Sequence, residues 1–213
     1  VKKNYNIICS AINTDVGSLV LSKQIHSDNV IRVTETDIGK GFNTEGFSDA
    51  DGLITNIKGL TLTAFFADCV PIFLLDPVMG AVGIIHSGWR GTALAIAKSG
   101  VKAMEREFNS NPKDILAAIG PSIGKCHYEV SEDVAMAVLN ICGDKSCIEK
   151  CSNDKYMLDL WKANEVILKK TGIKDENITL ANECTYCNHT KYFSHRYTDG
   201  KRGNLAALIS LTN

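Results

Sequence analysis

Short apolar runs and alternating apolar and polar positions fill most of this chain, a pattern that predicts many strands with a few helices between them. The helical stretches are the end of a helix over 1–12 and helices over 93–108, 131–140 and 159–171. Thr92 and Ser131 are the predicted N-caps of the middle two. The predicted strands are 17–24, 28–34, 52–55, 60–66, 70–76, 81–86, 115–119, 177–181, 191–195 and 204–211.

Strands outnumber helices in this reading, and several are expected to be antiparallel neighbours. We therefore expect a mixed α/β (α+β) fold, a layered α/β sandwich with mixed sheets, and not a doubly wound sheet. The Gly- and Asp-rich segment 37–52 reads as a surface loop and the polar segment 142–157 as irregular structure. With no linker or repeat in the sequence, residues 1–213 are expected to form a single domain.

Composition narrows the class of protein. The chain is 45% hydrophobic and 22% charged, with a net charge of -1 and a pI of about 6.6. These values are typical of a soluble globular protein. Because the net charge is close to zero, the protein has no strong positive potential that would attract nucleic acid or an acidic membrane. No apolar run approaches the roughly 18 residues of a membrane-spanning helix. The eight cysteines are expected to be reduced in a cytoplasmic protein, because the chain needs no disulfide staples.

The hairpin 70–86 contains the first candidate site. A turn at 77–80 sets Asp76 opposite Ala81 and Pro71 opposite His86, and Cys69 leaves the same face as Pro71 because side chains alternate. Cys69 and His86 are then diagonal neighbours, with α-carbons about 7–8 Å apart. A metal can bridge this gap, and His26 is a candidate third ligand of a zinc site with one open position. The alternatives are a small buried thiol and ordinary core or surface imidazoles.

A second group of possible ligands lies in CTYCNHTKYFSHR, which contains Cys184, Cys187, His189 and His195. One C-x-x-C with nearby histidines is half of a structural zinc pattern. Cys147 and Cys151 are candidates for the other half, but their spacing is poor. The favoured interpretation is a loop with scattered thiols.

The turn SGWRG, residues 87–91, feeds a predicted helix and suits an anion such as phosphate, for which Arg90 would supply a bidentate clamp. The alternative is a tight turn with Trp89 in the core. Arg196, Lys201 and Arg202 form a second basic group, which either adds to an anion site or covers a loop surface.

Ordered motifs give the chain a resemblance to a known family. The motifs are QIHSDNV, SDADGLIT, ADCVPIFLLD, HSGWRGT, IGPSIGKCHYEV, YMLDLWKAN, ECT and YFSHRYTDGKRGNLAALISL. Together they resemble the YfiH-like family, also called the laccase-domain or multicopper polyphenol oxidase family. The resemblance implies the layered fold known as the YfiH-like cysteine hydrolase fold and a metal triad of His26, Cys69 and His86. The family's N-terminal segment with an S-T-R-x-G-G-type motif does not precede Val1, so a single YfiH-like catalytic domain lacking it is expected.

The resemblance also implies an activity. Family members act as purine nucleoside phosphorylases on adenosine, inosine and methylthioadenosine, and they deaminate adenosine. The expected cofactor is zinc, which lowers the pKa of a bound water towards about 7. Arg90 and Arg196 are the expected residues for binding substrate or phosphate, and Asp68 is expected to be a supporting or structural carboxylate.

Three other functions stay open at this point. Copper-dependent polyphenol oxidation has been attributed to the family, but several His-rich copper sites need more than the five histidines of this chain. A cysteine hydrolase would use Cys69 as nucleophile and His86 as base. A metal-binding module would show no turnover. The expected partners are purine nucleosides and phosphate, not nucleic acid or a membrane, and the chain is a monomer or a homodimer.

Overall fold

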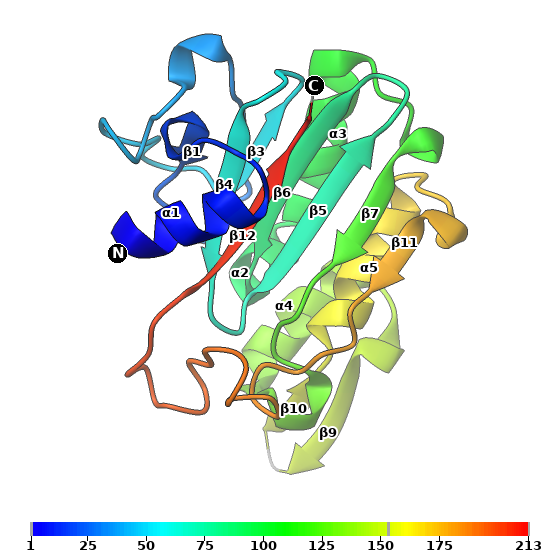
Figure 1. Cartoon of the computed structure of the whole chain (residues 1–213). Helices are drawn as coiled ribbons and strands as arrows, with labels where there is room; N and C mark the ends of the chain where they lie inside the picture. The colour runs from blue at the N-terminus through cyan, green and yellow to red at the C-terminus, as the bar shows by residue number, and fades with distance from the viewer. Residues whose placement is uncertain (1, 153, 213) are drawn as a thin grey trace.

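The computed structural model describes residues 2–152 and 154–212, which build a layered arrangement of sheets and helices (Figure 1). Its helices are α1 (Lys2–Ala11), α2 (Trp89–Ala93), α3 (Ile96–Phe108), α4 (Glu132–Cys142) and α5 (Leu160–Lys170). Its strands are β1 (Leu19–Leu21), β2 (Val30–Arg32), β3 (Gly52–Thr55), β4 (Thr61–Phe66), β5 (Val70–Asp76), β6 (Ala81–Ser87), β7 (Leu116–Ile119), β8 (Glu129–Ser131), β9 (Ile148–Ser152), β10 (Lys155–Leu158), β11 (Ile178–Leu180) and β12 (Leu205–Ser210).

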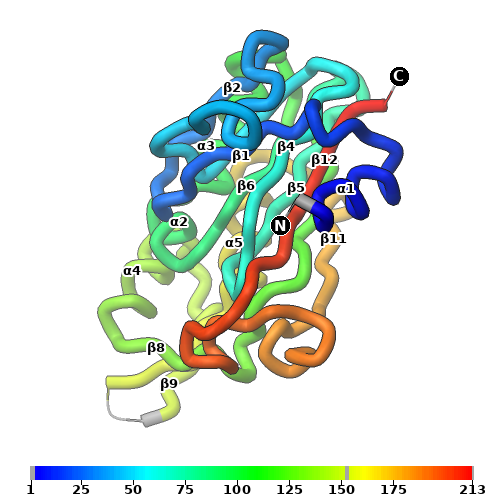
Figure 2. The backbone as a smooth tube through the Cα atoms, turned by 60° about the vertical axis from the view of Figure 1, so that its left-hand side comes forward, coloured from blue at the N-terminus to red at the C-terminus, as the bar shows by residue number. Residues whose placement is uncertain are grey.

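The central layer is a mixed sheet with strand order β11-β7-β5-β6-β3-β2. One face is covered by α2 and α3, with α4 and α5 packed behind them. The other face is covered by the sheet β1-β4-β12, which Figure 2 shows in front of the central strands, beside α1. A third small sheet, β8-β10-β9, packs with α4 at one end of the molecule. The predicted layered sandwich with mixed sheets is therefore confirmed.

Two apolar cores hold the layers together. Between the central sheet and the helices, Ile72 and Ile85 pack with Val101 and Met104. Between the two sheets, Leu62 and other buried residues of β4 pack against β3 and β6. Every residue of β6 is buried, since the strand lies in the middle of both interfaces. Any polar side chain near the end of β6 is thus largely shielded from water.

The hairpin register is the one that the sequence predicts. Asp76 pairs with Ala81, and Pro71 pairs with His86. The buried carboxylate of Asp76 accepts hydrogen bonds from the backbone N–H groups of Val78 and Met79, which fix the turn. The predicted strands at 17–24, 28–34, 52–55, 60–66, 115–119, 177–181 and 204–211 are confirmed. All but 52–55 have shorter bounds than predicted, and the first two are the most shortened.

The helix predicted over 93–108 is wrong in its first turn. Ala95 adopts a left-handed conformation with φ of 60°, which separates α2 from α3. Thr92 is consequently a residue of α2 and not an N-cap. Its hydroxyl donates to the carbonyl of Gly88 at 3.0 Å, inside the helix. The apolar sequence around the break gives no signal of it.

Two other predictions fail. The polar segment 142–157 contains β9 and part of β10, whose alternating burial (Tyr156 and Leu158 inside, Lys155 outside) is too short a pattern to stand out. Residues 191–195 form irregular structure and not a strand, because the backbone nearby closes local hydrogen bonds such as that from the Thr198 N–H to the Ser194 carbonyl. Among the described residues, no helix combines the length and apolar character needed to cross a membrane.

Candidate metal centre and its cavity

His26, Cys69 and His86 come together at one end of the hairpin. His86 is near the end of β6, Cys69 immediately precedes β5, and His26 lies in the loop between β1 and β2. Their possible ligand atoms all lie within 4.8 Å of one another. Cys69 Sγ is 3.8 Å from His26 Nε2, and the two imidazole rings meet edge to face with centroids 4.8 Å apart. The three residues that sequence reasoning singled out are therefore neighbours in space.

Asp51 holds two members of this cluster, His26 and His86, through hydrogen bonds. It was not among the site residues predicted from the sequence. Its buried carboxylate accepts a hydrogen bond from Nδ1 of His86 at 2.8 Å, so Nε2 is the nitrogen left for other contacts. The same carboxylate accepts the backbone N–H groups of three consecutive residues, Ile25, His26 and Ser27. These bonds hold His26 in its left-handed conformation, with φ of 66°.

The hydrogen bonds shift the protonation equilibria of the site. Burial opposes ionisation of Cys69, but contacts with His26 and His86 outweigh it and lower the pKa of the Cys69 thiol to about 6. Burial also opposes the charged form of His86, yet Asp51 and Cys69 raise the pKa of its imidazole to about 9. Desolvation would likewise raise the pKa of Asp51, but its hydrogen bonds hold that pKa well below the usual range. The site thus favours a thiolate at neutral pH, the form in which cysteine binds metals.

The cluster opens into a cavity of about 370 Å³. The cavity is lined by His26, Ala67, Asp68, Cys69, Gly88, Trp89, Arg90, Ile123, Tyr128, Leu160, His195, Arg196 and Arg202. Gly88 brings the backbone against the cluster: a methyl group there would lie 2.9 Å from Cys69 Sγ and 2.9 Å from the His26 ring. The SGWRG turn therefore needs glycine at this position because the chain passes so close to the candidate ligands.

Both arginines singled out from the sequence line this cavity. The Arg90 guanidinium stacks on Trp89, with its central carbon 4.5 Å from the ring centroid. Arg196 donates to the carbonyl of Glu129 at 3.0 Å and lies over the ring of Tyr128. Arg202 is a third cationic side chain in the lining. Lys201 lines a neighbouring surface depression instead, and Arg202 lines both.

Asp68 is a structural carboxylate, in agreement with one of the sequence expectations. Its two oxygens accept hydrogen bonds from the Thr185 hydroxyl and the Arg196 backbone N–H, each at 2.6 Å. Asp68 is buried and adopts a φ of 80°. It therefore ties the segment that precedes Cys69 to the long loop between β11 and β12.

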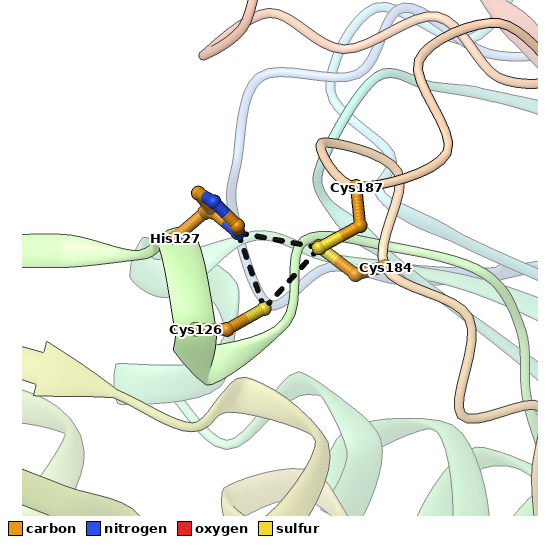
Figure 3. A group of neighbouring side chains, drawn as sticks. All are labelled: Cys126, His127, Cys184 and Cys187. Carbon is orange, nitrogen blue, oxygen red and sulfur yellow. Dashed lines mark hydrogen bonds between the residues drawn. The ribbon is translucent and has the colours of Figure 1, made fainter.

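The second candidate cluster has a different membership from the predicted one. Cys184 and Cys187 meet Cys126 and His127, and the possible ligand atoms of all four lie within 4.8 Å of one another (Figure 3). His189 instead stacks on Tyr197, and His195 lines the cavity. The favoured interpretation, a loop with scattered thiols, is therefore wrong for Cys184 and Cys187, and the candidate partners Cys147 and Cys151 lie elsewhere. The buried Cys147 contacts Cys142, and the exposed Cys151 faces Glu129.

The sequence of this chain is similar to those of known enzymes over most of its length. A family model described as multi-copper polyphenol oxidoreductase laccase matches residues 1–212. Purine nucleoside phosphorylase YlmD of Bacillus subtilis is 38% identical over 216 residues, which cover 99% of this chain and 77% of that protein. Adenosine deaminase RL5, from an unknown prokaryotic organism, is 32% identical over 189 residues, covering 87% of this chain and 72% of that protein.

A solved structure has the same fold. The crystal structure of the hypothetical protein YfiH of Bacillus licheniformis superposes with a TM-score of 0.95 and 36% sequence identity, and the match covers 99% of this chain and 80% of that one. The resemblance inferred from the ordered motifs is thereby confirmed. This chain belongs to the family of enzymes described as multi-copper polyphenol oxidoreductase laccases.

Proposed function

We propose that this protein is a zinc-dependent purine nucleoside phosphorylase that acts on adenosine, inosine and methylthioadenosine and also deaminates adenosine. In this proposal His26, Cys69 and His86 hold the zinc, while Arg90 and Arg196 bind phosphate or substrate. The observation that carries the proposal is that the three candidate ligands converge, and that two of them, His26 and Cys69, line a cavity that is also lined by arginines. The similarity to a purine nucleoside phosphorylase, YlmD, and to an adenosine deaminase, RL5, supports the same two reactions.

The donor set fits a catalytic zinc site. A tetrahedral metal bonded at about 2.3 Å to sulfur and about 2.0 Å to nitrogen separates those two atoms by about 3.5 Å. The 3.8 Å separation of Cys69 Sγ and His26 Nε2 is within about 0.3 Å of this value, so a small adjustment of the side chains would complete the site. Three protein ligands leave a fourth position for a reactant, and two of the three, His26 and Cys69, line the cavity. Two imidazoles and a thiolate also suit copper, so the metal itself is part of the proposal.

Zinc held by these residues would supply Lewis acidity towards a water molecule or a substrate oxygen. The protein's own side chains would orient the metal ligands and bind the purine. Asp51 orients His86 and favours its Nδ1–H form, while His26 and His86 keep Cys69 ionised. The apolar surfaces of Trp89, Ile123 and Leu160 in the cavity provide contacts for a flat purine ring.

Phosphorolysis also requires a dianion beside C1′ of the ribose, where positive charge develops as the glycosidic bond breaks. The guanidinium groups of Arg90, Arg196 and Arg202 line the cavity and provide planar donors that match phosphate oxygens. Tyr128 adds a neutral donor: burial first, and the nearby Cys69 thiolate second, raise the pKa of its hydroxyl, which therefore stays protonated. α2 has only five residues, so the arginine side chains and not the helix end are the basis of the phosphate site.

The test is chromatography of the purines released from a mixture of adenosine, inosine and methylthioadenosine, with and without phosphate, alongside elemental analysis of the purified protein. We expect free bases that depend on phosphate, inosine formed from adenosine without phosphate, and bound zinc. Bound metal without turnover of any nucleoside would contradict the enzymatic proposal. Copper with oxidation of a polyphenol would support the oxidase instead.

The cysteine hydrolase is the second candidate, favoured by the lowered pKa of Cys69 and its contact with two imidazoles. The two functions differ in what they require of the thiolate. As a metal ligand, Cys69 is protected from iodoacetamide by zinc and becomes reactive when a chelator removes the metal. As a nucleophile, Cys69 would react at the same rate with or without the chelator, and its alkylation would abolish hydrolysis.

A further inference from the structure

The second cluster consists of Cys126 and His127, at the end of a short 3-10 helix (Lys125–His127), together with Cys184 and Cys187 of the loop that follows β11. Figure 3 shows the four side chains pointing toward one another from these two segments. Cys126 Sγ is 3.6 Å from Cys187 Sγ, and His127 Nδ1 is 3.2 Å from Cys126 Sγ and 3.3 Å from Cys187 Sγ. Three thiols and an imidazole nitrogen therefore surround one point.

We propose that this second cluster is a closed structural zinc site, in which Cys126, Cys184, Cys187 and His127 Nδ1 bind one zinc ion that fastens the loop 181–204 to the body of the protein. It is separate from the His26–Cys69–His86 cluster, and it would exist whether or not the proposed activity is correct. Four protein ligands leave no open position, which is the arrangement of structural zinc sites and not of catalytic ones.

The distances match this chemistry better than they match a disulfide. Tetrahedral zinc with bonds of about 2.3 Å to sulfur and about 2.0 Å to nitrogen separates its sulfurs by about 3.8 Å and sulfur from nitrogen by about 3.5 Å. The observed 3.6, 3.2 and 3.3 Å are close to these values. A disulfide needs sulfurs about 2.05 Å apart and would use only two of the four groups.

The surrounding backbone is built around the cysteines. The N–H of Gly124, on the segment that precedes Cys126, donates to Cys184 Sγ at 3.2 Å, a hydrogen bond of the kind that orients a metal ligand from behind. A methyl group on Gly124 would approach Cys184 Cβ at 3.2 Å and Cys126 Sγ at 3.3 Å, so the chain fits tightly there. The His127 ring stacks on Tyr186, with centroids 4.1 Å apart, and this contact orients Nδ1 toward the sulfurs.

Two parallel segments bring the halves of the cluster into register. Ser122 donates its backbone N–H to the carbonyl of Glu183, and Thr185 donates its own N–H to the carbonyl of Ser122. Cys184, on one of these segments, is buried, while Cys126 and Cys187 are exposed. The site is thus on the surface but preorganised by the backbone.

The loop explains why a metal would be useful there. Residues 181–204 contain no helix or strand within the described chain. Loops of more than about 15 residues are uncommon and usually either carry function or lack order. The loop supplies Arg196 and Arg202 to the cavity. Thr185, inside the C-x-x-C turn, donates to Asp68, the neighbour of Cys69. A zinc ion would therefore fix the loop that completes the cavity, and it would do so without touching substrate.

The test is zinc content, measured by elemental analysis of protein purified from zinc-supplemented cells and passed through a desalting column. We expect two equivalents in the unaltered chain, one in Cys69→Ala and one in Cys126→Ser/Cys187→Ser. The matched control Cys151→Ser, which removes an exposed thiol elsewhere, should keep two. If the unaltered protein holds one equivalent and Cys69→Ala holds none, the proposal is wrong.

A second measurement does not depend on the folding of cluster variants. Cobalt-substituted Cys69→Ala should still show the intense thiolate-to-cobalt absorption and the tetrahedral visible bands of a three-cysteine site. Mass spectrometry under non-reducing conditions should find no Cys126–Cys187 disulfide. A disulfide between Cys126 and Cys187 would overturn the assignment. So would the absence of any thiolate-to-cobalt absorption in the Cys69→Ala variant. Nucleoside turnover takes no part in either readout, so the proposed activity can fail while this site stands.

Discussion

Asp51 binds His86 twice: its carbonyl accepts the His86 backbone N–H at 2.7 Å, and its carboxylate accepts Nδ1–H at 2.8 Å. The first bond belongs to the edge of the ladder between β3 and β6, where Gly52 pairs with Ile85. The second fixes the imidazole relative to that ladder. The orientation of a candidate metal ligand is consequently built into the register of the central sheet.

This relationship predicts that Asp51→Asn weakens zinc binding by about 10- to 100-fold, the usual cost of losing a carboxylate behind a ligating histidine. The neutral amide no longer stabilises the Nδ1–H form, and it loses the anion that accepts three backbone N–H groups. Competition with a chromophoric chelator measures the affinity. Asp49→Asn, an exposed neighbour, is the matched control. Equal affinities for the two variants would show that Asp51 does not position the site.

The pKa of Cys69 gives a prediction about pH. In metal-free protein the thiolate fraction of Cys69 should reach one half near pH 6, because His26 and His86 stabilise the anion against the opposing effect of burial. The rate of iodoacetamide modification, followed by mass spectrometry of the Cys69 peptide, should therefore rise through pH 6 and level off by pH 8. Reduced glutathione, an ordinary thiol, should still be gaining reactivity above pH 8. A Cys69 profile that follows glutathione would contradict the ion pair.

Local rules were enough to predict the hairpin half of the site. A two-stranded register follows from one turn, so Pro71 opposite His86 could be read from the sequence and placed Cys69 beside them. Asp51 could not be found in this way, because its position depends on the pairing of β3 with β6 across more than thirty residues of chain. The sequence shows Asp51 only as a carboxylate directly before a predicted strand, and nothing in that position indicates contact with His86.

The second cluster marks another limit of sequence reasoning. Cys184 and Cys187 have the spacing of half a zinc site, but their partners Cys126 and His127 are adjacent residues on a different segment and show no spacing pattern. The bridge between Ser122 and Cys184 brings them together. His189 was chosen for its nearness in sequence, and it stacks on Tyr197 instead. The break at Ala95 was also invisible, since alanine normally favours a continuous helix.

Asn164 of α5 anchors the SGWRG turn and yields a stability prediction. Its fully buried side chain accepts from the Ser87 hydroxyl at 2.8 Å and donates to Thr92 Oγ1 at 3.2 Å. Asn164→Ala removes both bonds from the core and leaves the Ser87 and Thr92 hydroxyls only with each other and with the Gly88 carbonyl. The loss should cost about 2–3 kcal/mol and lower Tm by about 4–12 °C. Thermal unfolding followed by circular dichroism measures the change. Asn140→Ala, on an exposed face of α4, should leave Tm within a few degrees.

Arg90 separates the two proposed reactions. Arg90→Ala should raise the KM for phosphate in phosphorolysis by about 10-fold, the value of one charged hydrogen-bonded contact, because it removes a guanidinium that lines the cavity and stacks on Trp89. Adenosine deamination needs no phosphate and should change by less than about 3-fold. Steady-state kinetics of both reactions on one preparation measures the split, and Arg106→Ala on the surface of α3 is the matched control. An equal loss in both reactions would mean that Arg90 shapes the cavity and does not bind phosphate.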